Sequence, residues 1–160
     1  MKKSILYVYS SLKQIIVPMK NSLIVLLTCA TLVTVSCKKD KEETQAVTKE
    51  NLAGSYKLAA LKVQVNGSVE EDAMSSIEAC QADDVTTLNA DQTYIVADAG
   101  TQCSPATDES GNWGLAGTTS FIMDGETFAI KSWNGKQLVL TETDNSSGTS
   151  ITYTTTLNKQ

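Results

Sequence analysis

Hydrophobic and polar residues alternate along short segments from about residue 52 onward. Between 127 and 133, Phe128 and Ile130 alternate with Thr127 and Lys131, and residues 150–157 alternate in the same way. A period of two is typical of β-strands with one buried face. The pattern predicts eight strands, at residues 56–65, 85–88, 93–97, 112–116, 120–123, 127–133, 137–142 and 150–157.

Turn residues separate these segments. Asn66-Gly67, Asp124-Gly125 and Asn134-Gly135 are pairs that favour tight hairpin turns. Consecutive hairpins with one apolar and one polar face indicate an antiparallel meander. Eight strands without a strong helix to cover an edge avoid exposed edges most simply by closing. We therefore expect an all-β fold, an antiparallel up-and-down eight-stranded β-barrel.

The first predicted strand contains a phase change. Its apolar positions alternate from Tyr56 to Ala60 and then shift by one, continuing from Leu61 to Val65. One extra residue in a strand has this effect, so the pattern predicts a β-bulge or sharp bend near Ala60.

A short helix is expected after the first strand. Ser68 and Glu71 have the spacing of a capping box, in which Ser68 is the N-cap and Glu71 reaches back to it. Apolar residues then follow at helical spacing, which predicts that one helical face lies against the sheet. These residues are Val69, Ala73, Ile77 and Cys80.

The N-terminal region has a different pattern. Residues 22–35 form a fourteen-residue apolar segment interrupted only by Thr, Ser and Cys, and the only charges before Cys37 are lysines. The segment is short for a membrane-spanning helix, which needs about 20 apolar residues. With its basic start and the cysteine that follows, it resembles a bacterial lipoprotein signal. The resemblance implies that residues 1–36 are a signal peptide and that Cys37 is lipidated.

Alternatives remain at this end of the chain. Translation could start at Met19, since residues 1–18 interrupt the apolar pattern. Cys29 competes for the lipid, although cleavage there would leave an apolar stretch on the mature protein. The third alternative is that the segment is an N-terminal anchor helix that is not cleaved. In each case the membrane is the expected partner, and with Cys37 the anchor is a set of fatty acyl chains such as palmitate.

Residues 37–51 are predicted to form the lipidated N-terminus and a flexible tether. The run 38–43 is charged, and the whole stretch is poor in large apolar residues. Charges directly after the cysteine resemble export signals of outer-membrane lipoproteins, although a plain linker explains them as well. We expect an outer-membrane lipoprotein of the cell envelope, on the periplasmic face or the cell surface.

Charge and composition restrict the chemistry further. The chain carries a formal charge of −5, and residues 37–160 retain nine lysines against all eighteen acidic residues, a charge of −9. Neither histidine nor arginine occurs. An acidic, arginine-free surface is poorly suited to nucleic acid. Without histidine a serine–histidine or cysteine–histidine relay is impossible. A carboxylate pair at residues 70–72 or at Asp83 and Asp84 is conceivable, but the start of a helix and a solvated turn explain these acids, so we expect no enzyme and no cofactor. Calcium at Asp83, Asp84 or Asp98 is an alternative without a recognised loop spacing.

Several short motifs resemble those of a known family. Residues 52–58 are similar to the opening Gly-x-Trp strand of lipocalins, with Tyr56 in place of Trp. Cys80, the acidic pair after it, Cys103 and Gly111-Asn112-Trp113 are similar to bacterial lipocalin-like lipoprotein domains. The resemblance covers about residues 50–158 and implies that residues 52–160 form a lipocalin-like barrel domain.

Two cysteines of this domain are candidates for a disulfide. An exported protein lies in an oxidising compartment, where Cys80 and Cys103 in one small domain favour a bridge. Such a bridge would stabilise the fold by roughly 3 kcal/mol in the chain-entropy model. A redox or metal-binding pair is the alternative.

The lipocalin resemblance implies a small apolar or amphipathic ligand inside the barrel. An eight-stranded barrel is just wide enough to be filled by side chains or to hold one small ligand. The alternative is a structural or interaction lipoprotein with a filled barrel, acting through a protein partner. Candidate ligand-binding residues are the aromatic side chains Tyr56, Tyr94, Trp113, Phe128, Trp133 and Tyr153.

Overall fold

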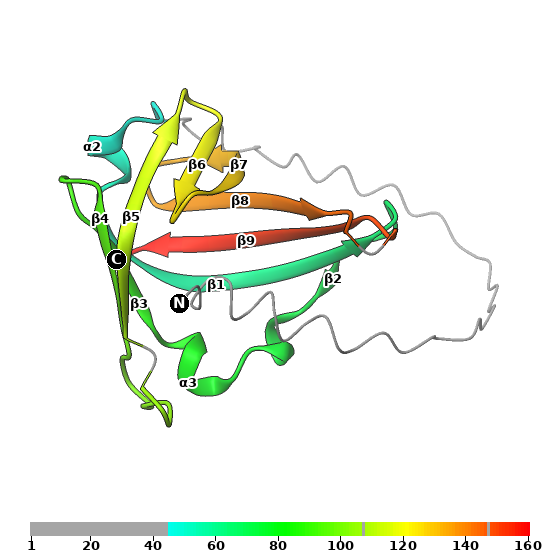
Figure 1. The fold of residues 1–160 in the computed structure, drawn as a ribbon, viewed down its shortest axis with the longest axis horizontal. Helices are drawn as coiled ribbons and strands as arrows, with labels where there is room; N and C mark the ends of the chain where they lie inside the picture. Colours follow the sequence, from blue (N-terminus) through cyan, green and yellow to red (C-terminus); the bar gives the residue numbers. More distant parts are fainter. Residues whose placement is uncertain (1–44, 107, 147) are drawn as a thin grey trace, which may run out of the picture.

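The computed structural model describes residues 45–106, 108–146 and 148–160. No helix within these ranges has the length and apolar character of a membrane-spanning segment. In chain order the elements are α2 (Lys49–Leu52), β1 (Gly54–Val65), β2 (Glu71–Asp72), the 3₁₀ helix η1 (Met74–Ser76), α3 (Ala79–Ala82), β3 (Val85–Leu88), β4 (Thr93–Ala97), β5 (Glu109–Ala116), β6 (Ser120–Met123), β7 (Glu126–Trp133), β8 (Gln137–Asp144) and β9 (Ile151–Lys159) (Figure 1).

Eight of these strands close into an antiparallel barrel. The sheet order is β1-β3-β4-β5-β6-β7-β8-β9, and β9 returns to pair with β1. This confirms the predicted all-β up-and-down barrel. Strand β2 lies outside the ring and pairs with β1 over two residues. Figure 1 shows β1, β8 and β9 as long strands lying side by side.

The predicted bulge in β1 is confirmed. Against β9, the register passes from Leu58 opposite Leu157 to Ala60 opposite Thr156, which leaves one extra residue in β1. Alternate residues of a strand share a face, so the extra residue returns Leu61 to the face that carries Leu58. Leu58, Leu61 and Val63 therefore share the inner face of β1 on the two sides of the bulge.

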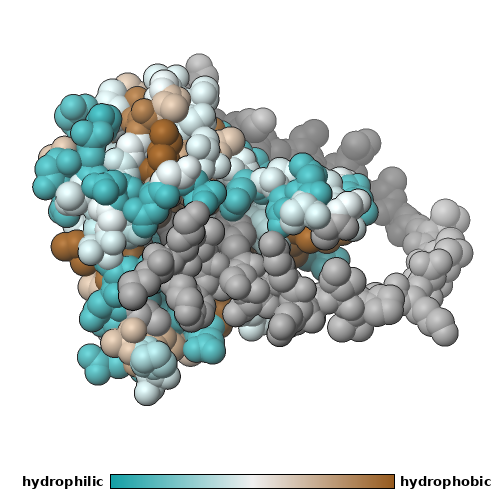
Figure 2. All heavy atoms as spheres, in the orientation of Figure 1, coloured by the Kyte–Doolittle hydropathy of each residue, from teal (hydrophilic) through white to brown (hydrophobic). Residues whose placement is uncertain are grey.

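Most of the buried side chains form two clusters. The larger consists of Leu52, Tyr56, Leu88, Tyr94, Val96, Trp113, Phe121, Met123, Phe128, Trp133, Leu138, Leu140 and Leu157. The smaller contains Leu61, Ala73 and Ile77. Leu58 packs against both, so the two clusters adjoin on the inner face of β1. Figure 2 shows the opposite character outside, where most of the visible described surface is hydrophilic or intermediate.

The helix after the first strand begins later than the capping box predicts. Ser68 is not an N-cap, because its hydroxyl lies at the turn and accepts from the Val65 amide at 3.4 Å. Val69, predicted to face the sheet, is 82% exposed. The only α-helix between β1 and β3 is α3 (Ala79–Ala82). Helix formation from Ser68 is therefore a wrong prediction, although a short helix does follow β1.

The open edge of β1 explains this difference. Strand β3 pairs with β1 only as far as Lys57, so the rest of that edge lacks a neighbour from the ring. Glu71 and Asp72 pair there as β2, and the Ala73 amide donates to the Leu61 carbonyl at 2.9 Å. Backbone pairing on a free edge outweighs the local helical preference. We call residues 71–82, which run from this edge to α3, the strap.

The N-terminal predictions fall largely outside the described residues. This holds for the signal peptide, for Cys37 and for the tether up to residue 44. The described part of the tether includes α2, which Thr48 caps by accepting from the Asn51 amide at 3.2 Å. Val47 packs against the larger cluster, so this part lies on the barrel.

The hairpin between β6 and β7 joins the barrel wall through Asp124. Asp124 and Gly125 have φ of 49° and 85°, as a tight hairpin turn with Asp-Gly requires. The Asp124 carboxylate accepts from the Asn112 amide at 3.0 Å and from the Tyr94 hydroxyl at 2.5 Å. This bond, together with burial as the larger effect, raises the pKa of Tyr94. The carboxylate thereby links β4, β5 and the hairpin.

Gly111 leaves the space that this carboxylate occupies, which gives a test of the link. A Cβ at position 111 would clash with the Asp124 carboxylate, whereas at Gly114, in the same strand, the nearest atom would be Gln92 Oε1 at 3.8 Å. We expect Gly111→Ala to lower the free energy of unfolding by about 1–3 kcal/mol, as overpacking does. Gly114→Ala should be neutral within about 0.5 kcal/mol. Urea unfolding measures both, and equal effects would contradict this role of Asp124.

Candidate functional site

All six candidate aromatic residues are buried inside the barrel. Five of them belong to the larger cluster, and the sixth, Tyr153, is 4% exposed on β9. Ring contacts occur in two groups: Tyr56 meets Trp133 with centroids 6.4 Å apart, and Phe121 lies between Trp113 at 5.9 Å and Phe128 at 6.4 Å. The sequence therefore identified residues that do lie together on the inner face.

Lys159 and α2 seal one end of the barrel. Lys159 Nζ lies 5.6 Å from the ring centroid of Trp133 and 6.0 Å from that of Tyr56, and it donates to the Asn51 carbonyl at 2.8 Å. The Tyr56 hydroxyl donates to the Leu52 carbonyl at 2.6 Å, and burial raises the pKa of that hydroxyl. Helix α2 is thus fixed across this end by a cation and a phenol.

The inner face becomes polar away from α2. On β8 the alternate positions 138 and 140 carry buried leucines, and the next two carry Glu142 and Asp144. On β9 the same face passes from Leu157 through Thr155 to Tyr153, which stands opposite Glu142. Burial, and then the charges of Asp144 and Glu142, raise the pKa of Tyr153. On β8 and β9 the inner face is therefore apolar near α2 and polar at the other end, where β1 still contributes Leu61 and Val63.

The two tryptophans differ in hydrogen bonding. Trp113 Nε1 donates to the Asn89 carbonyl at 2.9 Å. Trp133 is 2% exposed, and its Nε1 has no acceptor within the part of the chain that the structure describes. A buried donor without a partner is costly, and it marks a place where a water or a ligand atom could accept.

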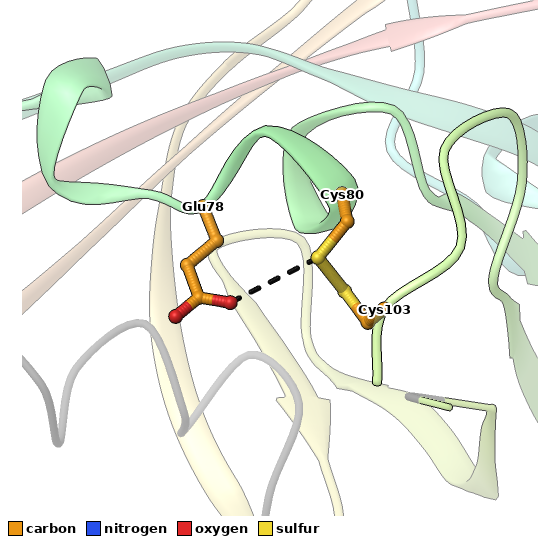
Figure 3. Close-up of side chains that lie close together, drawn as sticks. All are labelled: Glu78, Cys80 and Cys103. Carbon is orange, nitrogen blue, oxygen red and sulfur yellow. Dashed lines mark hydrogen bonds between the residues drawn. A yellow bond between two sulfur atoms is a disulfide. The ribbon is translucent and has the colours of Figure 1, made fainter. Parts of the chain in front are cut away.

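Cys80 and Cys103 form a disulfide with a Cα–Cα distance of 5.2 Å, as predicted. Glu78 lies beside it, with Oε2 3.9 Å from Cys80 Sγ (Figure 3). A disulfide sulfur has no hydrogen to donate, so this is a close approach of charge to sulfur. These three residues are the one group in the described ranges with metal-ligand proximity. Because metals bind thiolates and both sulfurs are bonded here, the intact bridge offers no thiolate site.

The three aspartates considered for calcium have protein partners, and Asp83 Oδ1 is a buried oxygen without one among the described residues. Each accepts from a backbone amide of the loop between β4 and β5. Asp84 accepts from Ala99 at 3.3 Å, Asp83 from Thr101 at 2.9 Å, and Asp98 from Cys103 at 3.1 Å. The carboxylates therefore organise this loop around the disulfide.

Three residues of the inner face were not singled out from the sequence: Lys159, Glu142 and Asp144. The signal that could have found them is strand parity. Continuing the alternation of β9 past Leu157 places position 159 on the inner face, and continuing that of β8 past Leu140 places 142 and 144 there. No pattern in the sequence indicates the contact of Lys159 with α2.

No protein-family model, curated protein or solved structure matches the chain significantly. The closed eight-stranded up-and-down barrel is compatible with the lipocalin-like fold that the sequence resembles. The functional argument therefore depends on the inner face of this barrel.

The unequal hydrogen bonding of the two indoles gives a paired prediction. Trp113→Phe would remove one of the two donors of the Asn89 carbonyl, which keeps the Gln92 amide, while Trp133→Phe would remove a donor that has no partner among the described residues. Both lose similar ring area, so we expect Trp113→Phe to be more destabilising by about 1 kcal/mol. Chemical unfolding of the two variants measures the difference. An equal or reversed order would mean that Trp133 Nε1 has an acceptor in solution.

Proposed function

We propose that this chain is a lipid-anchored, non-enzymatic protein of the cell envelope whose barrel binds a small amphipathic ligand. The observation that carries the proposal is the gradient along the inner face. Aromatic and leucine side chains line it near α2, and Glu142, Asp144 and Tyr153 line it on the long strands.

The gradient also suggests how a ligand would lie. Its apolar part would contact the aromatic cluster, and its polar end would lie toward Glu142 and Asp144. Carboxylates attract positive charge, so a cationic or zwitterionic head group fits this end better than an anionic one. The α2 end is filled by Tyr56, Trp133 and Lys159, so the ligand must be small.

The anchoring part of the proposal comes from the sequence. Residues 22–35 followed by Cys37 resemble a lipoprotein signal, and a cysteine with several acyl chains binds membranes stably. The charged residues after Cys37 favour an outer-membrane location, with the barrel on the periplasmic face or the cell surface.

A second function has its own support. The ring contacts of Trp113, Phe121 and Phe128 fill much of the barrel near α2, as in a barrel whose interior is side chains alone. Such a protein would be a structural or interaction lipoprotein that works through its outer surface and a protein partner.

Ligand binding is tested with two detergents of equal chain length below their micellar concentrations. We expect dodecyltrimethylammonium to change the fluorescence of Trp113 and Trp133 with saturation, and dodecyl sulfate to bind at least about tenfold more weakly. Glu142→Gln should weaken binding of the cation about threefold or more. Glu50→Gln, which removes the same charge from exposed α2, is the matched control.

Each outcome separates the alternatives. Saturable binding that depends on Glu142 and not on Glu50 supports the ligand-binding barrel. Absence of binding by either detergent favours the filled barrel. If both substitutions weaken detergent binding equally, binding depends on the net charge of the protein and not on the inner face of the barrel.

Lipidation is tested on the precursor expressed in a bacterial envelope. We expect Cys37→Ala to abolish the acyl mass and to move the protein out of the membrane fraction, because no other cysteine follows the apolar segment directly. Cys29→Ala is the control and should leave both unchanged. Loss of the lipid in the Cys29 variant alone would reassign the modified residue.

A further inference from the structure

The barrel wall is incomplete along the second half of β1. Strand β3 pairs with β1 from Gly54 to Lys57 only, whereas β9 follows β1 as far as Val65. Beyond Lys57, the edge of β1 that faces away from β9 is paired only with β2. Figure 1 shows the strap running along this edge from β2 to α3.

The strap covers the inner face with little packing of its own. Ala73 and Ile77 are its two buried residues and pack with Leu61, and Met74 and Ala82 are partly buried against this cluster. Its backbone is joined to β1 by the two residue pairs of β2 and by the bond from the Ala73 amide to the Leu61 carbonyl. So small a set of contacts gives low local stability.

Further attachments lie at the two ends of the strap. At its start, Glu70 accepts from Lys131 Nζ at 3.2 Å and from the Thr154 hydroxyl at 3.4 Å, and lies 3.7 Å from Lys62 Nζ. These ion pairs are exposed, and such pairs contribute little. At its other end, Cys80 is covalently bound to Cys103, in the loop between β4 and β5. The disulfide is therefore the dominant attachment.

We propose that the strap is a redox-controlled cover of the barrel, released when a dithiol reduces the Cys80–Cys103 bridge. Its role as the access route for a ligand rests on the proposed function, but its release from β1 does not. Both cysteines are partly exposed, so a small or protein dithiol can reach the sulfurs.

Reduction of the bridge takes two thiol–disulfide exchange steps. One thiolate of the dithiol attacks a bridge sulfur, the Cys80–Cys103 bond breaks, and the other cysteine leaves as a thiolate that takes up a proton. The second thiol of the reductant then attacks the mixed disulfide, and the remaining cysteine takes up the second proton. The dithiol is oxidised to a disulfide by two electrons, which reduce the bridge to two thiols.

Glu78 lowers the rate at which a thiolate reduces the bridge. Its carboxylate lies 3.9 Å from Cys80 Sγ (Figure 3), where it repels an approaching thiolate and disfavours a negative charge on Cys80. Glu78 thereby protects the bridge from weak or slow thiol reductants. We expect Glu78→Gln to speed reduction by dithiothreitol about two- to fivefold at low salt, and Glu50→Gln to leave the rate unchanged.

The test is hydrogen–deuterium exchange on the purified protein before and after dithiothreitol. Because the bridge holds the C-terminal end of the strap, peptides from residues 71–82 should exchange at least about tenfold faster after reduction. Peptides from β7 and β8 are the internal control and should not change. A Cys80→Ser, Cys103→Ser double variant should reproduce the reduced pattern without a reductant.

The outcomes are distinct. Unchanged exchange of the strap after reduction would overturn the proposal. So would equal acceleration in β7 and β8, because the bridge would then stabilise the whole barrel. If the strap is released but dodecyltrimethylammonium binds neither state, the ligand-binding function fails and the redox control stands. If the detergent associates faster after reduction, both are supported.

Discussion

The pairing of β1 with β9 is the interaction on which the rest of the structure depends. It closes the ring, and it works only because β1 contains one extra residue between Leu58 and Ala60. Without that residue, Leu61 and Val63 would point outward, opposite the face that carries Leu58. With it, one apolar face continues from the α2 end to the strap. The inner surface of the barrel, its second small cluster and the position of the strap all follow from this bulge.

The two ends of the barrel differ because the strands differ in length. Near α2, the short strands β3 and β4 complete the wall, and Lys159 fixes the helix over the rings of Tyr56 and Trp133. At the other end β1, β8 and β9 extend beyond these neighbours, and the strap stands where a strand would otherwise be. One barrel thus combines an aromatic end, which α2 covers, with an end that carries acidic residues and is completed by the weakly attached strap. This division separates the part that maintains the fold from the part that can respond to its surroundings.

Most of the fold could be predicted from local signals in the sequence. Neighbouring residues alone determine the Asp124-Gly125 turn and the alternation of apolar and polar residues in β7 and β9. The bulge in β1 appears in the sequence as a one-residue shift of its apolar positions. The helix at Ser68 was predicted wrongly because its competitor, the free edge of β1, exists only after the sheet has formed. The aromatic lining was identified by composition. The contact of Lys159 with α2 and the proximity of Glu78 to Cys80 could not be predicted, because they depend on tertiary contacts.

The closure of the barrel also has a consequence for how the chain is made. Tyr56 pairs with Lys159, so the first strand of the ring cannot complete its contacts until the last one has been synthesised. Until then β1 and β8 both present unpaired edges, and such edges are where chains aggregate. Loops that close over such a sequence distance also form slowly. Until the ring closes, the incomplete sheet is the species that a chaperone would have to shield.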